Sequence, residues 1–162
     1  MKKISLILLL AATAACSKGM ADGELTPGNW KQTATIKDIT VPGAPPQVVA
    51  ALKGMVGQTK TEENCMSAAE AKAGVKAMAQ GMQKGAGQCT SDGFTSGGGK
   101  MAGKITCKTG AGGDAVMTIN GTYDPKKLDM TADMETDNPA MPGGKAIIHM
   151  QMVAEHVGEC KK

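Results

Sequence analysis

The second half of the chain alternates apolar and polar residues with a period of two, and this pattern constrains the fold more than any other feature. It is clearest over residues 128–135, where Leu, Met and Ala alternate with Asp, Thr and Glu. Such alternation is typical of strands that bury one face and leave the other in water. By the same pattern, further strands are predicted over residues 30–39, 93–96, 101–108, 115–123 and 148–155, with a short candidate at 58–64.

Two segments have the spacing of helices instead. Residues 47–55 form one candidate, with Pro46 suited to its first turn. A second helix is predicted to run to about residue 82, and it begins with a capping box in which Ser67 and Glu70 bond each other's amides. Because short connections join the strands, we expect an α+β fold: a single antiparallel, curved β-sheet meander of about six strands packed against one or two helices.

The N-terminus has the pattern of an export signal. Lys2 and Lys3 precede an apolar stretch that is too short to span a bilayer as a helix and that ends in small residues before Cys16. A cysteine at this point is typical of bacterial lipoproteins, whose thiol receives diacylglycerol and whose acyl chains, such as palmitate, hold the protein on a membrane. The sequence therefore predicts a lipoprotein signal peptide over residues 1–15, lipidation of Cys16 and a flexible tether over residues 16–27.

The residues around Cys16 also predict where the protein is held. Ser17 follows the cysteine, and by the sorting rules of Gram-negative bacteria this favours the outer membrane, with the domain on its periplasmic side. The alternative is ordinary signal cleavage after Ala12-Thr13-Ala14, which has the small-x-small pattern and would leave the protein soluble in the periplasm.

Four cysteines remain once Cys16 is set aside, and they predict two disulfides, as is usual in a small exported domain. None lies in a C-x-x-C pair, so a thioredoxin-like or zinc-ribbon site has no support. Four cysteines allow three pairings. If the glycines at 97–99 form a hairpin turn, Cys89 and Cys107 fall opposite each other, and Cys65 is left to pair with Cys160.

The composition argues against nucleic acid as a partner. The chain has no Arg, the side chain best suited to bidentate phosphate recognition, and its aromatic residues are limited to Trp30, Phe94 and Tyr123. The partner that the sequence predicts is the membrane, through the N-terminal lipid anchor. No cofactor is predicted, and no Ser, His and Asp grouping indicates a catalytic triad.

Methionines supply the most plausible metal candidates. Met130, Met134, Met150 and Met152 fall on the predicted inward faces of two strands. Thioethers are soft ligands that suit Cu(I), which makes a copper site one interpretation. The alternative is a structural role, in which methionine fills a core that is short of aromatic residues.

Histidines and acidic residues are weaker candidates. His149 and His156 are seven residues apart, so they fall on opposite faces of the last strand and are poorly placed to share a metal. Four acidic residues share one strand face, either as a weak divalent-cation site or as a solvated face: Asp129, Asp133, Glu135 and Asp137.

Several motifs, taken in order, resemble those of a family of proteobacterial envelope proteins, the domain of unknown function 3617. They are the export signal, Pro27-Gly28-Asn29-Trp30, the segment from Cys65 to Glu70 that opens a helix, the Cys89 and Cys107 pair, and Gly158-Glu159-Cys160 near the end. The resemblance covers essentially the whole mature chain. It implies no particular activity or ligand.

These observations predict a non-enzymatic envelope lipoprotein with a single domain over residues 28–162. We expect a binding or structural module that faces the periplasm, with the concave apolar face of the sheet as the place for a ligand. Binding of copper or another metal by a Met-rich sheet face is the alternative function.

Overall fold

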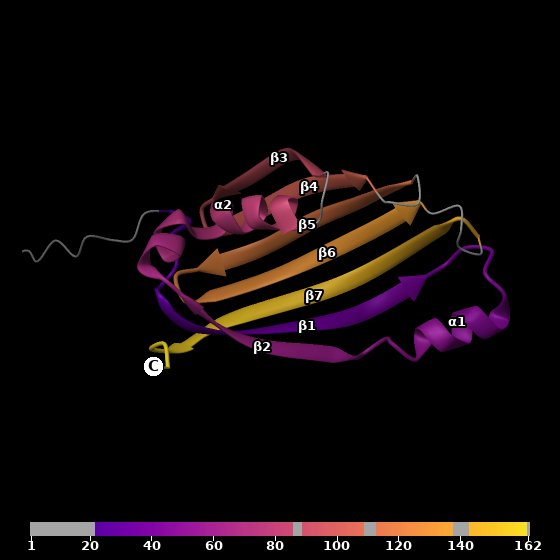
Figure 1. Cartoon of the computed structure of the whole chain (residues 1–162), viewed down its shortest axis with the longest axis horizontal. Coiled ribbons are helices and arrows are strands. Elements are labelled where there is room, and N and C mark those ends of the chain that lie inside the picture. The colour runs from indigo at the N-terminus through magenta and orange to yellow at the C-terminus, as the bar shows by residue number, and fades with distance from the viewer. Residues whose placement is uncertain (1–21, 86–88, 109–112, 138–142, 162) are drawn as a thin grey trace, which may run out of the picture.

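The computed structural model describes residues 22–85, 89–108, 113–137 and 143–161, with the backbone alone for residues 78–85. These segments form one seven-stranded antiparallel sheet and two helices, as Figure 1 shows. The elements in chain order are β1 (Gly28–Thr40), α1 (Pro46–Lys53), β2 (Thr59–Met66), α2 (Ala68–Gly85), β3 (Cys89–Gly97), β4 (Lys100–Lys108), β5 (Asp114–Asp124), β6 (Lys127–Asp137) and β7 (Lys145–Gly158). The predicted α+β class is confirmed.

The strand order is β2-β1-β7-β6-β5-β4-β3. From β3 to β7 each strand lies beside the next one in sequence, which is the predicted meander. The first strand, β1, instead pairs with the last, so that Gln32 lies opposite Ala154. The candidate strand at residues 58–64 forms β2 at the edge beside β1, and the sheet therefore has seven strands rather than about six.

Tight turns at one end of the sheet follow from local sequence. Gly98 and Gly99 connect β3 to β4 with φ angles of 58° and 74°, which a two-residue hairpin of matching twist requires. At the same end Pro125 and Lys126 connect β5 to β6, and the Lys126 amide donates to the Asp124 carboxylate at 2.7 Å. Side-chain capping of this kind makes Asp a favoured residue at the start of a turn.

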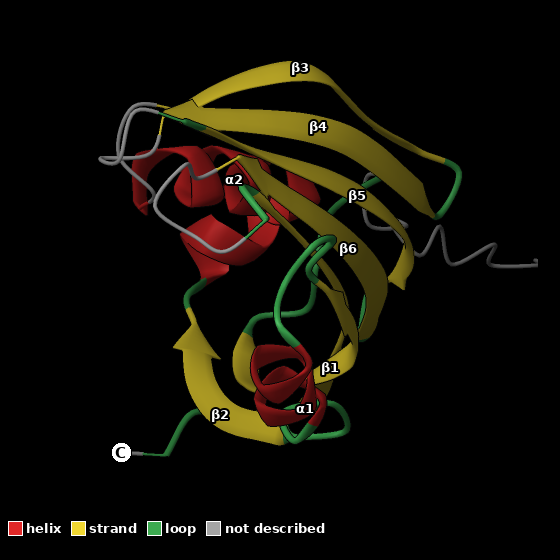
Figure 2. Ribbon diagram, turned by 90° about the vertical axis from the view of Figure 1, so that its right-hand side faces the viewer, coloured by secondary structure: helices red, strands yellow, loops and turns green. Residues whose placement is uncertain are grey.

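The core lies on the inner face of the sheet. Figure 2 shows the sheet curving around α2, which occupies the concave side. The main cluster combines side chains of this face with α2 and the segment before β1: Leu25, Trp30, Val75, Met101, Ile105, Cys107, Ile119, Tyr123, Leu128, Met130, Ala132 and Ala154. A smaller cluster of Ile39, Val41 and Ala146 packs with Leu52 of α1. Neither helix, within the described segments, is long and apolar enough to cross a membrane.

The start of α2 has the predicted capping box. The Ser67 amide and hydroxyl donate to Glu70 Oε2 at 2.8 and 2.7 Å, and the Glu70 amide donates to Ser67 Oγ at 3.3 Å. The helix is not continuous, however, because Gly74 has φ 59° and ψ −150° and breaks it. Glycine adopts this conformation without the penalty that a Cβ would bring.

Residues 22–27, the second part of the predicted tether, pack against the domain. Leu25 is 1% exposed, and its amide donates to the Ala71 carbonyl at 2.9 Å. The break in α2 leaves the amide of Val75 free to donate to the Gly23 carbonyl at 3.1 Å. The packed domain therefore begins before the predicted boundary at residue 28, because residues 22–27 pack against α2 where Gly74 breaks the helix.

Candidate functional site

A cavity of about 280 Å³ lies on the concave side, between α2 and the strands β2, β1, β7 and β6. It is on the face that the sequence indicated for a ligand. Its lining residues are Trp30, Gln32, Asn64, Cys65, Met66, Glu70, Gly74, Ala77, Leu128 and Ala154. We call this cavity the α2 pocket.

Trp30 lies in the apolar floor of the α2 pocket, and a hydrogen bond and a ring contact hold its side chain in place. It is 4% exposed, and its indole Nε1 donates to the Thr26 carbonyl at 2.8 Å. The ring meets the imidazole of His156 edge-on, with centroids 5.9 Å apart. Leu128 and Ala154, both buried, complete the floor from the neighbouring strands. A preformed apolar floor of this kind favours binding of an apolar group.

Polar groups lie at the rim of the pocket. Gln32 donates through Nε2 to the sulfur of Met152 at 2.8 Å, which fixes its amide beside the floor. Among the lining residues that the structure describes, Glu70 alone carries a charge. The hydrogen bonds from the Ser67 side chain and amide hold the pKa of the Glu70 carboxyl below its ordinary value, so it stays ionised at neutral pH. The described lining therefore combines an apolar floor with amide groups and one carboxylate that is engaged in capping.

The disulfides are those predicted. Cys65 pairs with Cys160, with α-carbons 5.4 Å apart, and Cys89 pairs with Cys107 directly across the β3–β4 hairpin. The first bridge lies in the wall of the α2 pocket and ties edge strand β2 to the end of the chain. Cys16, the predicted lipidation site, lies outside the described residues.

The four candidate methionines share the concave face, as predicted, but packing and hydrogen bonding engage them. Met130 is 4% exposed and belongs to the core. Met152, directly opposite Met130, accepts the hydrogen bond from Gln32 and also packs on the core. Met150 packs on the same cluster, while half-buried Met134 lies further along the face, opposite Ile148.

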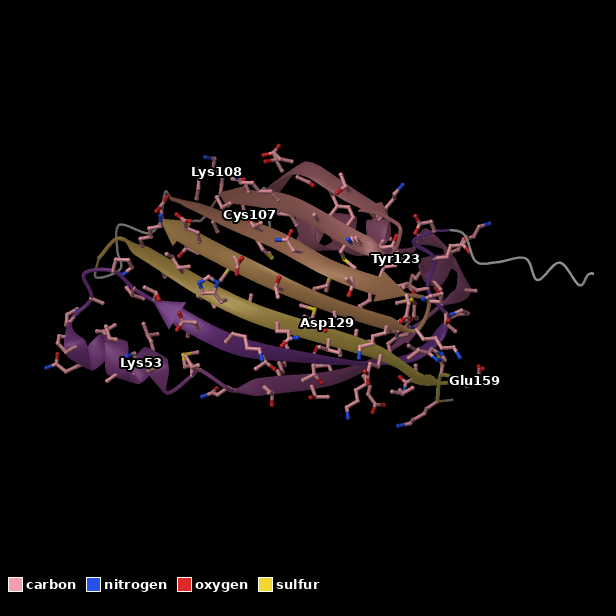
Figure 3. All side chains as sticks on the ribbon, turned by 180° about the vertical axis from the view of Figure 1, so that it is seen from behind. Lys53, Cys107, Lys108, Tyr123, Asp129 and Glu159 are labelled. Carbon is pink, nitrogen blue, oxygen red and sulfur yellow. A yellow bond between two sulfur atoms is a disulfide. The ribbon has the colours of Figure 1, made fainter. Side chains whose placement is uncertain are left out.

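The histidines and acidic residues lie where the strand pattern predicted. His149 is on the convex face, where its Nδ1 lies 2.6 Å from Asp133, and His156 is on the concave face beside Trp30. Residues of β7 are the partners of the acidic face of β6. Gln151 donates to Asp129, and His149 lies beside Asp133. Lys145 pairs with Glu135 and lies opposite Asp137. Among the described residues no three His, Cys, Asp or Glu side chains are grouped to hold a metal ion. Figure 3 shows this convex face, with Asp129 near its middle.

The sequence marks Trp30 as a strand residue, Cys65 as a disulfide partner and Glu70 as a capping residue, but it does not join them into a site. The α2 pocket depends on the pairing of β1 with β7, which brings Trp30 beside residues more than a hundred positions later. Gln32 gave no signal beyond its place in a polar and apolar alternation. The available clue was a Trp in a predicted half-buried strand, together with a capping box on the second predicted helix.

Comparison with known proteins identifies one family. The family profile described as "Protein of unknown function (DUF3617)" matches residues 25–160. No curated protein and no solved structure matches the chain. The matched range begins at Leu25, the residue that the structure buries under α2, and ends at Cys160, the last residue of the two disulfides.

Proposed function

Because the chain belongs to the DUF3617 family, whose description names no activity, its function has to be inferred from its own geometry. We propose that it is a non-enzymatic lipoprotein of the bacterial cell envelope that binds a small apolar ligand in the α2 pocket, on the periplasmic side of the outer membrane. The observation that carries the proposal is the pocket itself, with a fixed Trp30 floor and a polar rim.

Binding rather than catalysis is the activity that fits this lining. An apolar group that enters the pocket gains about 25 cal/mol for each Å² of apolar surface removed from water. Gln32 and Asn64 at the rim offer amide groups that can orient a polar end of the ligand. Two disulfides in a domain of this size support an oxidising compartment, as does the export signal.

Binding can be followed through the intrinsic fluorescence of Trp30, the one Trp of the chain, with N-phenyl-1-naphthylamine as an uncharged apolar probe. Ala77 lines the pocket from α2 and is half-buried, so Ala77→Leu should fill part of the cavity. We expect the dissociation constant of the probe to rise about tenfold, which corresponds to roughly 1.4 kcal/mol.

Ala73→Leu is the matched control, because it makes the same change at an exposed position of the same helix. It should leave probe affinity unchanged. Equal affinity in wild type, Ala77→Leu and Ala73→Leu would mean that the probe binds elsewhere, and the α2 pocket would lose its assigned role.

The lipid anchor is tested separately with Cys16→Ser. The variant should move from the membrane fraction to the soluble periplasmic fraction, because the thiol that receives the diacylglycerol is gone. Mass spectrometry of the wild-type N-terminus should show the added lipid on Cys16. A variant that stays in the membrane fraction, or a wild type without that mass, contradicts the lipoprotein assignment. A wild type without that mass favours ordinary cleavage after Ala12-Thr13-Ala14.

A further inference from the structure

The first described residue, Asp22, is bonded to the turn end of the sheet. Its Oδ1 accepts a hydrogen bond from the Tyr123 hydroxyl at 2.6 Å, and its Oδ2 accepts one from the Gly98 amide at 2.8 Å. The bond from Tyr123, followed by that from Gly98, holds the pKa of Asp22 below its ordinary value, and the same contact raises the pKa of Tyr123. The carboxylate is therefore charged at neutral pH and joins β5 to the β3–β4 turn.

Three further backbone hydrogen bonds hold the residues after Asp22 against the domain. The Gly23 carbonyl and the Leu25 amide bond to α2, and the Thr26 amide donates to the Pro125 carbonyl in the β5–β6 turn at 2.7 Å. With Leu25 buried to 1% exposure, this segment is part of the folded domain. Hydrogen bonds to α2 and to the β3–β4 and β5–β6 turns fix the position of this segment relative to the sheet.

The chain between Cys16 and Asp22 is short. Five residues, 17–21, separate them, and even a fully extended chain of this length reaches at most about 20 Å. By comparison β1 has 13 residues, so at about 3.3 Å per residue its two ends are roughly 40 Å apart. A lipid on Cys16 therefore keeps one end of the sheet close to the bilayer, while the far end is out of its reach.

We infer that the turn end of the domain, formed by Asp22, the Gly98–Gly99 turn and the Pro125–Lys126 turn, faces the lipid surface to which the chain is anchored. This inference rests on the proposed lipidation of Cys16. The anchored domain then has one preferred orientation relative to the membrane instead of rotating freely on a flexible tether. We call residues 22–27 the docked segment. Its Gly23 packs against Gly74, which also lines the α2 pocket, so the pocket lies at the membrane-proximal end.

Exposed lysines at the two ends of the sheet allow a direct test. Lys100 and Lys126 lie at the turn end, and Lys53 lies in α1 at the other end. Figure 3 shows Lys53 and Tyr123 at opposite ends of the sheet. Labelling of each lysine by a water-soluble amine reagent, read by mass spectrometry, reports how close it lies to a membrane.

The mature chain, starting at Cys16, is coupled through that thiol to a maleimide phospholipid in vesicles of phosphatidylethanolamine and phosphatidylglycerol. The other four cysteines are in disulfides, so Cys16 is the reactive thiol. Compared with the same chain capped without lipid, labelling of Lys100 and Lys126 should slow severalfold, and labelling of Lys53 should not change. The natively lipidated protein in the same vesicles should give the same pattern.

A longer tether provides the control. Insertion of about 20 Gly and Ser residues after Ser17 adds roughly 25 Å of average reach and should remove the protection of Lys100 and Lys126. Protection of Lys53 equal to that of Lys100, or no protection at any lysine, overturns the inferred orientation. Because chemical coupling supplies the anchor here, this result is independent of native lipidation, which the Cys16→Ser fractionation reports by itself.

Discussion

Replacement of both Cys65 and Cys160 by serine should lower the free energy of unfolding by about 4–5 kcal/mol, the largest loss expected from any single crosslink in this domain. The bridge closes a loop with a sequence separation of 95 residues, and in the chain-entropy model the stabilisation grows with loop length. The structure adds a second reason. Strand β2 is exposed along almost its whole length and lies at the edge of the sheet, so it has little buried apolar surface to hold it.

The matched control is the double replacement of Cys89 and Cys107 by serine. Its loop has a sequence separation of 18, and the expected loss is about 3 kcal/mol. Both double variants are compared with wild type by urea unfolding under non-reducing conditions, with Trp30 fluorescence as the signal that monitors unfolding. If the Cys89 and Cys107 pair proves the more costly to remove, loop length does not govern the stabilisation, and strain or residual structure in the unfolded chain must dominate.

Gly74→Ala is the second change with a large expected effect. At φ 59° and ψ −150°, an added Cβ would lie 1.8 Å from the Gly23 carbonyl oxygen, which is backbone and cannot move aside alone. Strain of about 1–3 kcal/mol at such a conformation adds to loss of the packed segment around Leu25. We expect stability to fall by at least about 3 kcal/mol, measured by the same urea unfolding.

Gly57→Ala separates the two contributions. Gly57 also has a positive φ, of 84°, but an added Cβ there meets nothing within 4 Å. This control should lose only the conformational term of about 1–2 kcal/mol. A Gly74→Ala variant that is no less stable than Gly57→Ala would show that residues 22–25 contribute little to the fold, and the docked segment behind the proposed membrane orientation would lose its support.

Local sequence was sufficient for the elements and for the covalent crosslinks. The alternation over residues 128–135 specified a strand and the face that it buries, because side chains on a strand alternate between its two sides. The capping box of Ser67 and Glu70 located the start of α2, since each side chain bonds the other's amide within four residues. The two glycines of the β3–β4 turn set the register that places Cys89 opposite Cys107.

The site itself was decided by contacts between distant parts of the chain. Gln32 and Met152 bond across 120 residues because β1 pairs with β7, and alternation specifies which face a strand buries but not which strand lies beside it. Glycine permits a break in a helix without requiring one, so Gly74 gave no sign that residues 22–25 pack into α2. The sequence by itself determined the strands and the disulfides, and the export signal stays a prediction from the same local patterns. The tertiary structure alone decided the α2 pocket and the docked N-terminal segment, because both depend on neighbours that no local pattern encodes.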